Sequence, residues 1–130
     1  MKIMVGYDSS NVSKAALELA KKHAKAFDAE VYVITSMVGG REVAREEFSR
    51  AESDLEYAET LLKEDNVSCE TRLLVRGMSP GEDMVEFAKE KEIDEIIVGV
   101  RKRSKVGKFL LGSTAQYLII KAPCPVVAVK

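Results

Sequence analysis

Two short stretches of this 130-residue chain hold residue types that suit the binding of a small anion. The longer one begins at Gly99, directly after the apolar run 96–98, and ends at Gly112-Ser113-Thr114. Glycine lets the backbone turn sharply and lets a ligand approach it, while amides and hydroxyls at a helix N-terminus attract phosphate. Ser113 could also be a plain helix N-cap, and the sequence leaves both roles open.

Between these glycines lies a local excess of positive charge. Five of the eight residues in 101–108 are basic, namely Arg101, Lys102, Arg103, Lys105 and Lys108. The formal net charge of the chain is only −1, so this cluster suits one small anion better than a long polyanion such as nucleic acid. The same side chains could instead form a solvated surface loop.

The second stretch is Asp8-Ser9-Ser10-Asn11, which follows the strand-like residues 2–7. A carboxylate at this place can bind a ribose hydroxyl, the amino group of a base or a metal ion, or it can cap the following helix. Asp8 is the carboxylate of the two stretches best placed to hold Mg²⁺. Neither stretch offers a convincing general base or nucleophile, so no catalytic residue is predicted.

The elements that must position these residues alternate along the chain. Apolar runs predict strands, and apolar residues at helical spacing predict helices. The expected strands are 2–7, 30–35, 68–75, 95–99 and 125–129, and the expected helices are 12–27, 41–64, one that starts at 79–82, and 113–122. This alternation predicts an α/β fold, with a parallel sheet covered by helices on both faces.

In such sheets ligands bind beyond the carboxyl ends of the strands, where the strand order reverses. If strands 2–7 and 95–99 are neighbours, Asp8 and Gly99 line the same crevice. Within the last helix, Ile119 is expected to face inward with Leu118. The last strand, 125–129, is expected at a free sheet edge that a second copy of the chain would cover.

Other classes of protein are disfavoured by composition. Two cysteines and the single His23 cannot assemble the four ligands of a zinc site. No apolar run approaches the roughly 18 residues that a membrane span needs. Because Met1 is followed by a strand-like segment and not by a signal peptide, a cytoplasmic location is expected, with neither membrane nor nucleic acid as a partner.

Three segments resemble the universal stress protein family, the UspA-like domain: IMVGYDSS (3–10), VRGMSPGEDMVEFAKEKEIDEIIVG (75–99) and LLGSTAQYLIIKAPCPVVAV (110–129). The resemblance covers residues 1–130 and implies a single domain. It implies an open five-stranded parallel sheet of order 3-2-1-4-5, Rossmann-like and similar to the adenine nucleotide alpha hydrolases. It also implies a homodimer, which we expect to form through 125–129.

The resemblance further implies a nucleotide site. Some members bind ATP through a glycine motif, whose first glycine matches Gly99 and whose last pair matches Gly112-Ser113, while its middle glycine falls on Lys102. Asp8 matches the pocket aspartate of the family, and the end of strand 30–35 would frame the base by backbone groups. The predicted nucleotide-binding residues are therefore Asp8, Ser9, Thr35, Ser36, Met37, Gly99, Arg101, Lys102, Gly112, Ser113 and Thr114.

The function implied is a small stress-response module that binds ATP or another adenine nucleotide, with or without Mg²⁺ held at Asp8. Two alternatives stay open at this point. Lys102 in place of glycine favours a UspA-like protein that does not bind ATP and acts by association with other proteins. A slow ATPase, with weak hydrolysis at most, is the third possibility.

Overall fold

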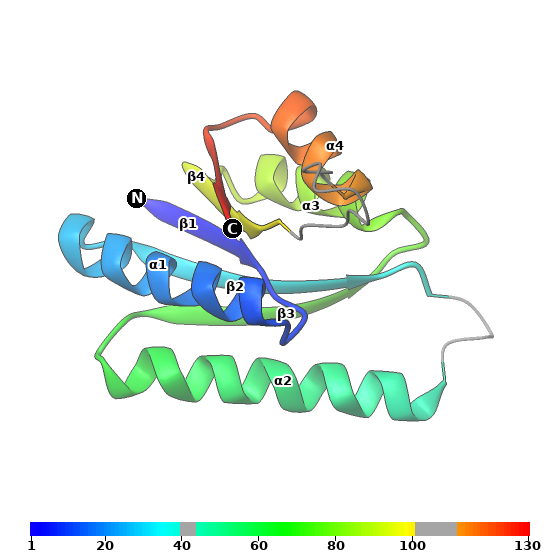
Figure 1. Cartoon of the computed structure of the whole chain (residues 1–130), viewed down its shortest axis with the longest axis horizontal. Helices are drawn as coiled ribbons and strands as arrows, with labels where there is room; N and C mark the ends of the chain where they lie inside the picture. The colour runs from blue at the N-terminus through cyan, green and yellow to red at the C-terminus, as the bar shows by residue number, and fades with distance from the viewer. Residues whose placement is uncertain (40–43, 101–111) are drawn as a thin grey trace, which may run out of the picture.

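The computed structural model describes residues 1–39, 44–100 and 112–130 (Figure 1). Strands and helices alternate along these residues, as predicted. They are β1 (Lys2–Gly6), α1 (Asn11–Phe27), β2 (Glu30–Met37), α2 (Arg45–Glu64), β3 (Cys69–Val75), α3 (Pro80–Glu90), β4 (Glu95–Gly99), α4 (Ser113–Lys121) and β5 (Val126–Val129).

The strands form a parallel sheet in the order β3-β2-β1-β4-β5, which confirms the predicted fold class. Strand β1 lies at the centre and pairs with β2 on one side and with β4 on the other. On the β4 side three residues are in register, from Ile3 opposite Glu95 to Val5 opposite Ile97. The direction of winding therefore reverses between β1 and β4, and the crevice beyond their carboxyl ends is the expected ligand position.

Helices α1 and α2 cover one face of the sheet, and α3 and α4 cover the other (Figure 1). Leu17 and Leu62 pack with Val5 on the first face, while Phe87 and Leu118 pack on the second. Strands β1, β2 and β4 are buried on both faces, which explains why they read as continuous apolar runs.

Several element ends differ from the sequence predictions by one residue, and three further differences are larger. Strand β2 extends to Met37, two residues beyond the prediction, because its pairing with β3 continues to Val75. The described part of α2 begins at Arg45 and not at residue 41, and 40–43 lie outside the described residues. Ile119 is 47% exposed, since Leu118 fills the position toward the sheet.

None of the helices in the described part of the chain is both long and apolar enough to cross a membrane.

Candidate functional site

A crevice of about 340 Å³ lies where the winding of the sheet reverses. The ends of β1, β2 and β4 line it, together with the first turns of α1 and α4. Pro80 and Met84 of α3 form part of its wall. Its volume falls within the range of small-molecule sites, and its lining mixes apolar side chains with polar groups, as such sites do.

The crevice brings together most of the predicted site residues. Those that line it are Asp8, Thr35, Ser36, Gly99, Gly112, Ser113 and Thr114. Ser9 and Met37 do not line it. Arg101 and Lys102 lie outside the described residues, so their part in the site stays a prediction.

Asp8 lies in the loop between β1 and α1 and is an exposed residue of the crevice lining. Its Oδ1 accepts a hydrogen bond of 3.0 Å from the Ser10 amide, and its own amide lies 3.4 Å from Ser13 Oγ. The N-cap of α1 is Ser10, whose side chain accepts from the Ser13 amide, so the alternative that Asp8 caps this helix is wrong. The loop thus presents an exposed carboxylate whose position is set by local hydrogen bonds.

Gly99 ends β4 beneath the first turn of α1. A Cβ at this position would lie 2.7 Å from both the carbonyl carbon and the carbonyl oxygen of Val12. Real Cβ atoms do not approach backbone so closely, and therefore the packing of α1 over β4 requires glycine here. The predicted reason for Gly99, close approach of a ligand, is not needed to explain the residue.

Gly112 differs from Gly99 in this respect. It is the N-cap of α4, with φ −66° and ψ 159°, an extended conformation that any residue adopts. A Cβ here would meet no atom of the described residues within 4 Å. Neither backbone conformation nor packing among these residues requires glycine, and Gly112 is one of the residues that line the crevice.

The first turn of α4 also lines the crevice. Since Gly112 is the N-cap, Ser113 is the first helical residue, and the alternative that Ser113 caps α4 is wrong. A glycine N-cap has no side chain that could accept a hydrogen bond from the first backbone amides of the helix. These N–H groups can therefore donate to an anion. The hydroxyls of Ser113 and Thr114 lie at the same end.

The hydroxyl groups at the end of β2 are bound within the protein. Thr35 Oγ1 donates to the carbonyl oxygen of Tyr7 at 2.7 Å, and Ser36 Oγ donates to Oδ2 of Asp83 at 2.7 Å. Asp83 belongs to α3, its side chain is fully buried, and the sequence prediction missed it. An acidic residue on the buried side of an expected helix was the signal that could have found it.

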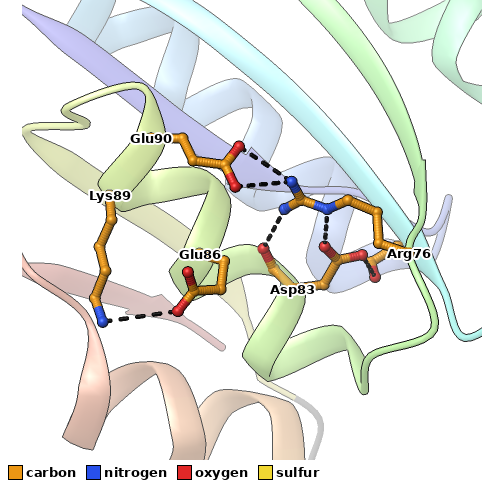
Figure 2. Close-up of polar contacts among 6 residues, drawn as sticks. Arg76, Asp83, Glu86, Lys89 and Glu90 are labelled. Carbon is orange, nitrogen blue, oxygen red and sulfur yellow. Dashed lines mark hydrogen bonds and ion pairs between the residues drawn. The ribbon is translucent and has the colours of Figure 1, made fainter.

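Asp83 forms an ion pair with Arg76, which follows β3. Arg76 Nε lies 2.5 Å from Asp83 Oδ1, and Nη2 donates to the Asp83 carbonyl oxygen at 3.1 Å. Nη1 contacts both carboxylate oxygens of Glu90, at 2.9 and 3.0 Å (Figure 2). The hydrogen bond to Asp83 is the main reason why the pKa of Arg76 is raised. Through these contacts the ends of β2 and β3 hold α3, and with it the wall formed by Pro80 and Met84.

Tyr7, which also lines the crevice, has a buried hydroxyl with no hydrogen-bond partner among the described residues. Burial raises its pKa, and the nearby Asp54, Tyr57 and Asp8 raise it further. A buried hydroxyl without a partner costs about 1–3 kcal/mol of stability. We therefore expect Tyr7→Phe to increase the free energy of unfolding by about 1 kcal/mol in urea denaturation.

Tyr32 offers a control for this substitution, because its hydroxyl is not among the buried groups left without a partner and lies near the carboxylate of Glu30. Tyr32→Phe should be no more stable than the parent. If Tyr7→Phe unfolds at a lower urea concentration than the parent, the Tyr7 hydroxyl has a stabilising partner and the expectation is wrong.

Comparison with known proteins gives the same fold and a consistent family. The model of the universal stress protein family matches residues 1–130. A universal stress protein of Mycolicibacterium smegmatis is 34% identical over 128 residues, which cover 98% of this chain and 96% of that protein. A universal stress protein structure from Archaeoglobus fulgidus has a TM-score of 0.90 and 34% identity, covering 100% of this chain and 93% of that one. Another structure, of the Archaeoglobus fulgidus protein in complex with dAMP, has a TM-score of 0.86 and 32% identity, covering 100% and 98%.

Proposed function

The chain belongs to the universal stress protein family, and we propose that its crevice binds an adenine nucleotide. The observation that carries this proposal is the open space at Gly112, beside the first turn of α4, where nothing in the described residues requires a glycine. The dAMP bound by the relative from Archaeoglobus fulgidus supports the choice of ligand.

The crevice residues suggest how the nucleotide would lie. Its phosphate would accept hydrogen bonds from the first turn of α4, with Ser113 and Thr114 as further donors. The exposed carboxylate of Asp8 suits a ribose hydroxyl, or Mg²⁺ carried by a longer phosphate chain. Backbone groups of Ser36 would frame the base. Whether the phosphate chain extends to ATP depends in this proposal on Lys102.

We propose binding without strong turnover. Asp8 is the one carboxylate among the described residues that line the crevice, and the other titratable group among them is the phenol of Tyr7, whose hydroxyl is buried. A single exposed carboxylate does not make the paired acid and base, or the activated nucleophile, that efficient hydrolysis needs. ATP hydrolysis would therefore be weak at most.

A thermal shift assay tests the binding. Saturation with AMP, ADP or ATP in millimolar Mg²⁺ should raise the melting temperature, because a ligand at a hundredfold excess over its Kd stabilises the folded state by about 2.7 kcal/mol. GMP and CMP at the same concentration serve as controls and should shift the temperature less. If none of the three adenine nucleotides shifts it, the proposed function is wrong and the family alternative of protein association gains weight.

We also propose that the chain forms a homodimer through β5. Its backbone pairs with β4 through the carbonyl oxygens of Pro125 and Val129, which accept from Ile96 and Val100 at 3.0 and 2.7 Å. Because backbone groups alternate sides along a strand, those of Val126 and Ala128 point away from β4. The order of the sheet leaves this side as an edge, which a second copy of β5 would cover. A cytoplasmic location completes the proposal and agrees with the two cysteines being free thiols.

Ala128→Pro tests this interface sharply. Proline removes the outward-facing amide that would pair with the second copy but no amide that pairs with β4, and edge strands tolerate it. We expect a monomer by light scattering at micromolar concentration, whereas the control Ala128→Val should keep the dimer. An unchanged dimer mass in Ala128→Pro, or a monomeric parent, would contradict the proposed interface.

A further inference from the structure

The hydroxyl of Ser36 has a fixed direction that bears on which base the crevice accepts. Ser36 lines the crevice, and its Oγ donates to Oδ2 of Asp83 at 2.7 Å. A serine hydroxyl carries one proton and two acceptor lone pairs. With its proton committed to Asp83, the oxygen can only accept a hydrogen bond from a ligand.

The partner of Ser36 cannot reverse this direction. Asp83 is fully buried, and its other oxygen forms an ion pair with the guanidinium of Arg76. A carboxylate in such a pair accepts hydrogen bonds and donates none. Arg76 is itself held by both oxygens of Glu90 (Figure 2). The contacts of Asp83 with Ser36 and Arg76 therefore fix the polarity of the Ser36 hydroxyl, and Glu90 adds only a half-exposed contact on the far side of Arg76.

We propose that Asp83 acts as a positioning residue which keeps Ser36 an acceptor toward the crevice, so that the site selects a base edge carrying an amino group over one carrying a carbonyl. This inference rests on the proposed function and adds a specificity determinant to it. Adenine carries an amino group where hypoxanthine carries a carbonyl oxygen. With hypoxanthine in the site, its carbonyl oxygen and Ser36 Oγ would face each other as two acceptors with no proton between them. A ligand that leaves such a hydrogen bond unformed binds much more weakly.

The test compares the dissociation constants of AMP and IMP by isothermal titration calorimetry. The parent should bind AMP at least about tenfold more tightly than IMP. In Ser36→Ala the acceptor is gone, so this ratio should fall severalfold toward one. A role of Ser36 in packing alone would weaken AMP and IMP equally and leave the ratio unchanged.

Two variants of the supporting residues distinguish an effect of the direction of the Ser36 hydroxyl from a general effect on packing. In Asp83→Asn the side-chain amide can donate to Ser36 Oγ, which frees the hydroxyl proton for the ligand and should favour IMP relative to the parent. Glu90→Gln leaves the contact between Ser36 and Asp83 in place, and its ratio should equal that of the parent. Circular dichroism checks that each variant is folded, and Ser36→Ala decides the question should Asp83→Asn fail to fold.

The outcomes distinguish this inference from the proposed function. An unchanged ratio in Ser36→Ala, with AMP still bound by the parent, overturns the inference and leaves nucleotide binding standing. A parent that prefers IMP overturns it as well. A parent that binds none of AMP, ADP, ATP and IMP overturns both.

Discussion

Gly112→Ala should weaken adenine nucleotide binding at least tenfold while lowering the free energy of unfolding by no more than about 1 kcal/mol. A Cβ at this N-cap meets no described atom of the protein, and the backbone conformation suits alanine, so the fold loses only the small advantage of glycine over alanine at an N-cap. The added methyl group would instead occupy the space proposed for the phosphate. Calorimetric titration with AMP and urea denaturation measure the two effects separately.

Gly99→Ala is the matched comparison, since the chemical change is the same at another glycine that lines the crevice. Here the Cβ would meet the backbone of Val12 at 2.7 Å, so α1 would have to shift away from β4. Forced repacking of this kind costs about 1–3 kcal/mol, and contact with backbone places the expected loss at the upper end, about 3 kcal/mol. A Gly112→Ala variant that loses as much stability as Gly99→Ala, or that binds AMP as the parent does, would contradict the role assigned to Gly112.

Asp83→Ala should destabilise the protein by about 3 kcal/mol. The substitution removes the buried partner of Arg76 and the acceptor of the Ser36 hydroxyl at once. Breaking a buried ion pair from one side costs about 3–5 kcal/mol, and the lower end applies because the Arg76 side chain is 30% exposed and keeps Glu90. Urea denaturation followed by circular dichroism provides the measurement.

Glu90→Ala provides the control, because it removes the other carboxylate that contacts Arg76. The Glu90 side chain is 51% exposed, and an exposed ion pair contributes about 0–1 kcal/mol. The loss in Glu90→Ala should therefore be well below that in Asp83→Ala. Equal losses in the two variants would mean that burial of Asp83 adds nothing to the strength of the contact.

The sequence predicted most of the sheet because its signals are local. The buried strands β1, β2 and β4 are short apolar runs between helical patterns, and Gly112 precedes an apolar helix. The resemblance supplied the strand order, which no local pattern contains. The general rule for parallel sheets supplied the expectation that Asp8 and Gly99 line one crevice, and the resemblance added Ser36 at the end of β2. The structure brings all three residues to one crevice.

What the sequence could not predict depends on contacts between distant residues. Ser36 and Asp83 are 47 positions apart in the sequence, and no pattern of residue spacing predicts that they pair. Gly99 fits a ligand-binding motif, yet the backbone of Val12 is what excludes a side chain there. At Asp8 the neighbouring Ser10 competes for the same capping role, and only the folded loop shows which of them fills it.

The pairing of β1 with β4 also affects how strongly the two halves of the molecule are held together. The residues through β3 build one half of the molecule and those from α3 onward build the other, and within the sheet the halves meet along the three-residue register of β1 and β4. A molecule in the crevice that contacts both Asp8 and Gly112 would bridge the boundary between these two halves. Its binding free energy would then add to the free energy needed to separate the two halves. A bound ligand would therefore hold the two halves of the molecule together as well as occupy the crevice.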